Sequence, residues 1–77
     1  MEFIYSRHWN IQRKFRPEIT DQIILYAIIN SNEIRDKYWS DRLNAIARIP
    51  PSGRIIKVIY KRISLDKIKI ITAFWLD

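Results

Sequence analysis

The segment PPSGRIIKVIYKRISLDKIKIITAFW, residues 50–75, decides the fold of this chain. It opens with the clearest turn in the sequence, because consecutive prolines cannot continue a strand ladder and Gly53 can adopt a positive φ. Residues 54–62 and 68–75 are both rich in β-branched side chains, and the turn-forming stretch SLDK at 64–67 separates them. The pattern therefore predicts two long antiparallel strands, each preceded by a tight turn.

Two shorter runs upstream alternate between apolar and polar residues, as half-buried strands do. One run covers residues 34–39, and the other extends from Leu43 to Ile49. Both runs are short and bounded by turn-forming residues, which favours strands. The second half of the chain therefore predicts four strands of one antiparallel sheet.

The residues before these strands carry helical signals. Thr20 can cap a helix that runs to about residue 31, and Asp21 lies in its first turn, where the helix macrodipole favours an acid. Apolar side chains at 23–29 cover most of the circumference of this helix, which predicts burial on more than one side. Residues 5–15 predict an imperfect amphipathic helix, which Arg16 ends because the following residue is proline.

The expected fold is α+β: a single domain over residues 1–77, with two N-terminal helices packed on one face of a four-stranded antiparallel sheet. The length supports one domain, because a chain of 77 residues cannot assemble a second hydrophobic core. Four strand residues, Ile55, Val58, Ile70 and Ile71, are expected to be largely buried. We expect function on the face of the sheet that the helices leave open.

Composition excludes several classes of protein. The chain has no cysteine and one histidine, which excludes a disulfide framework, a thiolate metal site and a His-rich metal site. Its longest apolar run, residues 23–29, is far shorter than the roughly 20 residues that cross a bilayer. The N-terminal stretch MEFIYSRHW lacks the apolar core of a signal peptide. We therefore expect a cytoplasmic protein with no metal, no cofactor and no membrane partner.

The charge points to a polyanionic partner. Fourteen basic residues against eight acidic ones give a net charge of +6, which produces a strong positive potential on so small a surface. Basic side chains neutralise phosphates and aromatic rings stack on unpaired bases, so single-stranded RNA is the expected partner. The expected RNA contacts are Arg13, Arg54, Lys57, Lys61 and Arg62. The alternative is that the strand aromatics form the core and the lysines between them form a solvated face.

Metal-independent cleavage of RNA needs groups that transfer protons and cations that hold the phosphate. His8 and Tyr60 are the candidates for proton transfer, and Tyr60 would need a pKa lowered by neighbouring cations. Arg16 is the third candidate catalytic residue, with Arg54 and Lys57 as further cations. This hypothesis requires His8 and Arg16 to approach the sheet face that carries Tyr60. The alternative for His8 is a surface or capping role.

The order of these residues resembles a family of small prokaryotic proteins related to BrnT-like toxins of the RelE/ParE superfamily. That family has a His, an Arg four residues after the His and a second Arg eight residues after the His. Here His8 and Arg16 match this pattern, and Gln12 stands where the first Arg would be. The stretches GRIIKVIYKR and KIKIITAFW resemble the closing strands of the family, so the similarity covers most of the chain.

The resemblance implies a RelE-like fold and a toxin of a type II toxin–antitoxin pair. Characterised relatives cleave mRNA, often on the ribosome, and an antitoxin from the neighbouring gene covers the basic face. ParE-type members of the superfamily instead poison gyrase, so the fold does not settle the function. The leading hypothesis is a metal-independent endoribonuclease acting on mRNA. The alternative is a non-enzymatic module of the same fold that binds nucleic acid or protein.

Overall fold

The structure, a computed structural model, describes all residues 1–77. Its first half contains strand β1 (Glu2–Tyr5), helix α1 (Arg7–Gln12), the 3₁₀ helix η1 (Arg13–Phe15) and helix α2 (Asp21–Ile29). Its second half contains strands β2 (Ile34–Arg35), β3 (Leu43–Ile49), β4 (Arg54–Arg62) and β5 (Lys67–Trp75). The α+β class with two α-helices is therefore confirmed. Neither α-helix is long and apolar enough to cross a membrane.

The sheet has five strands in the order β1-β5-β4-β3-β2, and β1 pairs parallel to β5 while all other pairs are antiparallel. The prediction of a four-stranded antiparallel sheet was wrong because it left out β1. This strand alternates exposed Glu2 and Ile4 with half-buried Phe3 and Tyr5. Its partner lies at the other end of the chain, and a pairing of that kind leaves no local sequence signal.

Strand β2 is shorter than the predicted run at 34–39, because it ends at Arg35. Asp36 ends it: the carboxylate accepts the backbone N–H groups of Tyr38 at 2.9 Å and Trp39 at 3.0 Å. A side chain that bonds to the backbone just ahead of it offers a turn in place of a strand ladder. These bonds also lower the pKa of Asp36, with the bond from Tyr38 as the main cause.

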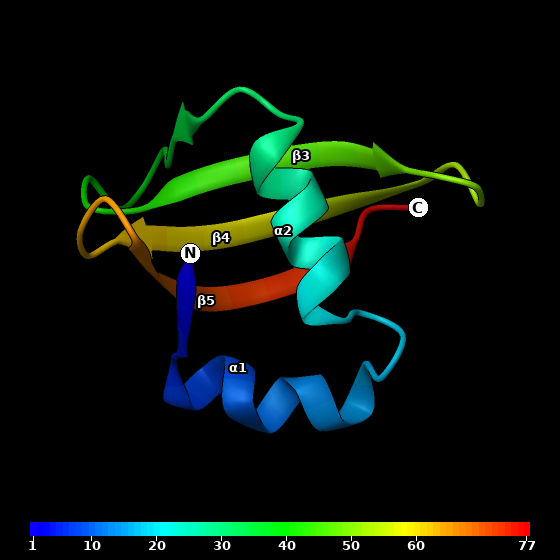
Figure 1. The fold of residues 1–77 in the computed structure, drawn as a ribbon, viewed down its shortest axis with the longest axis horizontal. Coiled ribbons are helices and arrows are strands. Elements are labelled where there is room, and N and C mark those ends of the chain that lie inside the picture. The colour runs from blue at the N-terminus through cyan, green and yellow to red at the C-terminus, as the bar shows by residue number, and fades with distance from the viewer.

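The two helices occupy different positions on the sheet (Figure 1). Helix α2 crosses one face, whereas α1 lies beside β5 at the edge of the sheet. The prediction of both helices on one face was therefore wrong for α1. Strand β1 covers the edge of β5 only as far as Ile70, and Ser6 continues the coverage through bonds from its N–H to the Ile70 carbonyl at 2.9 Å and from its Oγ to the Ile71 carbonyl at 2.7 Å.

The predicted helix and turn signals are confirmed at α2 and at the β3–β4 hairpin. The Thr20 hydroxyl accepts the N–H of Ile23 at 3.3 Å, and the helix begins at Asp21. In the hairpin, Gly53 has φ = +77°, a conformation that other residues adopt only with strain. The signals succeed because both are satisfied by bonds between near neighbours in the chain.

The core lies between the sheet and the helices and contains fourteen buried apolar residues in one cluster. The predicted burial of Val58 and Ile70 is confirmed, whereas Ile55 and Ile71 are only half-buried. Successive side chains on a strand point to opposite faces, so Ile55 faces away from the core that contains Ile56. The register of β4 and β5 shifts by one residue beside Ile71, as in a β-bulge.

Candidate nucleic-acid interface at the sheet edge

The sheet face opposite α2 is termed the open face. Its side chains alternate with the buried ones along each strand. They include three lysines and several apolar residues: Ile4, Asn44, Ile46, Ile55, Lys57, Ile59, Lys61, Lys69, Thr72 and Phe74. No helix covers this face, so it combines cations with accessible apolar surface.

A polar network joins the α1–η1 segment to β5 at the border of the open face. The Nη1 of Arg16 donates to the side-chain oxygen of Gln12 at 3.0 Å and to the backbone oxygen of Ala73 at 2.9 Å. The Thr72 hydroxyl donates to the same Gln12 oxygen at 2.6 Å. The guanidinium of Arg16 is therefore fixed to the sheet through one nitrogen. Its Nε and Nη2 donate to no other protein group and can bind an anion.

His8 belongs to the same side of α1 as this network. It precedes Gln12 by four residues within the helix, and residues at that spacing lie on one helix face. The imidazole is exposed and makes no hydrogen bond to the protein. The structure thus brings Arg16 to the sheet and leaves His8 accessible one helical turn from Gln12.

Sequence reasoning missed the roles of Gln12 and Thr72. The signal for Gln12 was its spacing, because His8, Gln12 and Arg16 follow one another at intervals of four. Thr72 is a hydroxyl-bearing residue in the otherwise apolar stretch from Ile70 to Trp75. Neither signal indicates that one amide oxygen accepts hydrogen bonds from both partners, since that contact joins residues far apart in the chain.

The lysines of the open face continue from this network across two strands. Lys57 pairs with Phe74, and Ile59 pairs with Thr72, across β4 and β5. Lys61 is partly neutralised by Asp41, whose carboxylate lies 3.5 Å from its Nζ. Lys57 and Lys69 form no salt bridge. These two lysines therefore lie on β5, to which Arg16 bonds, and on the neighbouring β4.

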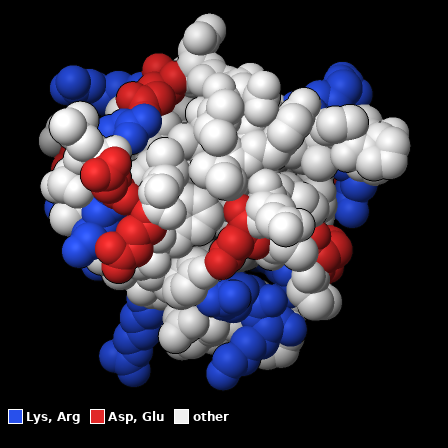
Figure 2. All heavy atoms as spheres, viewed as in Figure 1, with Lys and Arg blue, Asp and Glu red and all other residues white.

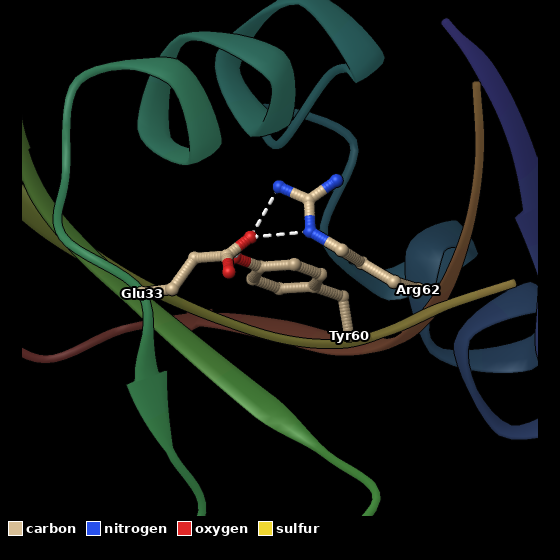
Figure 3. A network of polar contacts seen from close by, with 3 residues as sticks. All are labelled: Glu33, Tyr60 and Arg62. Atoms are coloured by element: carbon tan, nitrogen blue, oxygen red, sulfur yellow. Dashed lines mark hydrogen bonds and ion pairs between the residues drawn. The ribbon is translucent and has the colours of Figure 1, made fainter. Parts of the chain in front are cut away.

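Tyr60 is excluded from this surface, which corrects the prediction that it transfers protons there. It is fully buried on the α2 side of the sheet, and its hydroxyl donates to Glu33 at 3.0 Å (Figure 3). Burial and the bond to Glu33 raise the pKa of Tyr60. Arg62 donates to the same carboxylate oxygen from Nε at 2.6 Å and lowers the pKa of Glu33. Tyr60 is thus a neutral structural donor.

The predicted RNA contacts do not share one surface. The four on β4 divide between the two faces of the sheet because side chains alternate along a strand, and Arg13 lies outside the sheet. Lys57 and Lys61 lie on the open face, whereas Arg54 and Arg62 have the opposite orientation. The Arg54 guanidinium stacks 4.2 Å from the centre of the Trp75 ring, and Arg62 pairs with Glu33. On the α2 side, Lys and Arg lie mainly around the margin and leave the middle mostly free of basic atoms (Figure 2). No continuous basic surface crosses that side.

Arg13 lies in a groove beside the start of α2. Its guanidinium is 4.3 Å from the centre of the Tyr5 ring, and the Tyr5 hydroxyl donates to Asp21. Burial and this bond raise the pKa of Tyr5. Two adjoining hollows of about 480 and 300 Å³ share Asp21 and Gln22, and neither is lined by Arg16 or Lys57. The groove is therefore separate from the polar network at β5.

Tyr60→Phe separates a structural role from a catalytic one. Loss of the hydroxyl removes the hydrogen bond to Glu33 and is expected to lower the free energy of unfolding by about 1–2 kcal/mol. We expect RNA binding and cleavage to stay at the wild-type level. Urea unfolding and a cleavage assay on the same preparation check both parts. Loss of cleavage in a variant that remains folded would return Tyr60 to the site.

Comparisons with protein-family models, curated proteins and solved structures find no match to this chain.

Proposed function

We propose that this protein binds single-stranded RNA across the open face and cleaves it at the edge of the sheet where α1 lies beside β5, termed the α1–β5 edge. The protein would then be a toxin of the BrnT-like, RelE/ParE-related kind. The observation that carries the proposal is the position of Arg16. Its guanidinium is anchored to Gln12 and to Ala73 of β5 and keeps donors free, and β5 and its neighbour β4 carry Lys69 and Lys57, which form no salt bridge. The resemblance in the spacing of His8 and Arg16, with Gln12 where the family has an Arg, supports the same site.

The proposed reaction uses the RNA itself as nucleophile. The 2′-oxygen attacks the adjacent phosphorus, the bond from phosphorus to the 5′-oxygen breaks, and a 2′,3′-cyclic phosphate remains. His8 takes the proton of the 2′-hydroxyl and its protonated form supplies one to the leaving 5′-oxygen. Arg16 donates hydrogen bonds to the phosphate oxygens, on which charge builds up in the transition state. Lys57 and Lys69 hold the flanking phosphates.

A direct test uses labelled single-stranded RNA with purified protein, alone and with translating ribosomes. The proposal expects fragments that end in a 2′,3′-cyclic phosphate in at least one of the two conditions. It also expects growth arrest when the protein is produced without an antitoxin. Absence of cleavage in both conditions, together with normal growth, would contradict the enzymatic proposal.

Binding without cleavage is the second candidate function, and the open face favours it. Lys57 and Lys69 make no salt bridge, and they lie among the apolar side chains of Ile59 and Phe74. Such a surface can hold phosphates and bases without any group that transfers protons. A protein that binds RNA, leaves it intact and does not arrest growth would fit this function.

Both functions predict that RNA binding depends on salt and on the open-face lysines. The logarithm of the binding constant should fall with the logarithm of the salt concentration, at about −0.7 for each phosphate neutralised. Replacing Lys57 and Lys69 together by glutamine should lower that slope by about 1.4. Arg35→Gln is the matched control, because Arg35 lies at the opposite edge of the sheet. Fluorescence anisotropy measures all three proteins, and a slope unchanged by the double substitution would contradict the assignment.

A further inference from the structure

The outer edge of β3 is largely without a partner strand. Strand β2 pairs with Leu43 and Asn44 only, although β3 continues to Ile49. In Figure 1, β2 borders one end of β3 and no strand borders the rest of that side. An unpaired edge of this kind presents backbone donors and acceptors to another chain.

The hydrogen-bond pattern identifies the free backbone groups. The N–H of Leu76 bonds to the carbonyl of Ile55, so the backbone of Ile55 faces β5 and that of Ile56 faces β3. Ile56 is paired with Ala47, whose backbone therefore faces β4. Because the direction alternates, the backbone groups of Ile46 and Arg48 face outward. The bond from the Asp36 N–H to the Arg42 carbonyl, at 2.9 Å, shows the same alternation on the β2 side.

The residues that carry these outward groups are exposed. Ile46 is 40% exposed, and Arg48 is exposed as well. No hydrogen bond from a turn, loop or side chain uses the backbone of either residue. Two N–H groups and two carbonyl groups are therefore available, which is the pattern that an added strand needs. The prolines after Ile49 end this edge because they have no N–H to donate.

We propose that the β3 edge, defined by the backbone groups of Ile46 and Arg48, accepts an extended acidic segment of a partner protein as a sixth strand. Strand β3 contains no acidic residue, and Arg42, Arg48 and Arg35 of the neighbouring β2 surround it with positive charge. The acids of the adjoining loop are already engaged: Asp36 binds two backbone N–H groups and Asp41 pairs with Lys61.

The same charges disfavour a second copy of this chain as the added strand. Each copy carries a net charge of +6, so two copies that meet at the Ile46–Arg48 edge bring the Arg48 side chains of both chains close together. Like charges close to each other across neighbouring strands are destabilising. An acidic segment reverses the sign of this interaction, because it can place carboxylates on the face of the sheet that carries the Arg48 side chain.

This docking edge is separate from the proposed cleavage site, although the Ile46 side chain belongs to the open face. Strands β4 and β3 separate β5, which carries the network of Arg16, from the outer edge of β3. A partner strand therefore adds on the far side of the sheet from Arg16. Loss of RNA cleavage and loss of partner binding are distinguishable, because substitutions at Ile46 leave the α1–β5 edge intact.

Amide hydrogen exchange of the full chain tests the proposal, with a short peptide of alternating glutamate and valine as the probe. At a peptide concentration about ten times the Kd, exchange of the Ile46 and Arg48 amides should slow about tenfold. A peptide of alternating lysine and valine is the control and should leave both amides unchanged. Protection confined to other amides, or equal protection by the two peptides, would overturn the proposal.

Three substitutions sharpen the test. Ile46→Pro removes the outward N–H without breaking a bond to β4, as proline at a strand edge can do, and should abolish protection by the acidic peptide. Ile46→Ala keeps that N–H, so the acidic peptide should still protect the amides of this variant. If Ile46→Pro unfolds, Arg48→Glu replaces it and should weaken peptide binding at least tenfold. Dimers of the free protein that protect the same two amides would overturn the acidic partner in favour of a second copy.

Discussion

His8→Ala is expected to lower the rate of RNA cleavage by about 10²–10⁴-fold, the usual cost of removing a group that transfers a proton. Arg16→Ala should lower it by about 10²–10³-fold, because it removes donors aimed at the charge on the phosphate. Production of either variant should relieve growth arrest. Cleavage rates measured on labelled RNA, with and without translating ribosomes, check the expectation.

The controls separate catalysis from folding. His8 is exposed and makes no hydrogen bond to the protein, so its replacement should leave the Tm nearly unchanged. Arg16→Ala removes two hydrogen bonds, at about 1 kcal/mol each, so its cleavage rate must be measured well below its own Tm. Arg7→Ala removes a neighbouring cation of α1, and this variant should cleave RNA at close to the wild-type rate. If both His8→Ala and Arg16→Ala retain full cleavage, the catalytic assignment is wrong.

Arg16→Lys refines the same prediction. A lysine keeps the positive charge but lacks the planar fork that bonds to Gln12 and Ala73 while it holds a phosphate. We expect RNA binding at low salt to stay within about twofold of wild type, since the charge is retained. Cleavage should remain at least about tenfold below wild type. Full recovery of cleavage by lysine would indicate that Arg16 acts through charge alone.

The elements that the sequence predicted correctly are those with local causes. Thr20 caps α2 through a bond to Ile23, three residues away, and Gly53 closes a hairpin between adjacent strands. The long runs that form β4 and β5 satisfy their ladder with each other across a short turn. Each of these features needs information from a few neighbouring residues only.

The features that the sequence did not predict all depend on contacts between distant segments. Strand β1 pairs with β5, more than sixty positions away in the chain. Because β1 is short, Ser6 and Arg16 bond to the β5 edge beyond it, and α1, which lies between these two residues in the chain, lies at this edge and not on the face of the sheet. Periodicity shows that the first helix is amphipathic, but it does not show which surface of the sheet that helix meets.

The candidate site illustrates the same division. The spacing of His8 and Arg16 is local, and the structure keeps both on the α1–η1 segment beside β5. The assignment of Tyr60 and Lys57 to one surface failed because they are three positions apart on a strand and face opposite sides. The alternation of side chains along a strand could have placed these two residues on opposite faces. The hydrogen-bond partner of Tyr60, Glu33, lies in a loop that no strand pattern connects to β4.

Trp9 links the stability of the fold to the proposed site. It is 1% exposed, and it belongs to the same six-residue helix as Gln12. Ser6, whose hydroxyl caps α1 at the Trp9 N–H, also bonds to β5, so the N-terminal end of the helix is tied to the sheet. Burial of the indole adds the apolar contact that holds α1 against the sheet. The position of Arg16 on β5 therefore depends on the packing of Trp9.

Trp9→Ala is expected to lower the free energy of unfolding by about 3–5 kcal/mol, the usual cost of truncating a buried tryptophan. A domain of 77 residues has a total stability of only about 4–12 kcal/mol. The variant should therefore be partly or fully unfolded at 37 °C and inactive on RNA.

Trp9→Phe distinguishes loss of packing from loss of the indole N–H. The Nε1 of Trp9 is buried without a hydrogen-bond partner, so phenylalanine removes an unsatisfied donor while it keeps most of the apolar contact. We expect less than half the destabilisation of Trp9→Ala, and RNA cleavage close to wild type. Urea unfolding followed by circular dichroism measures both variants. A Trp9→Ala protein within about 1 kcal/mol of wild type would show that α1 is held to β5 by its hydrogen bonds and not by the indole.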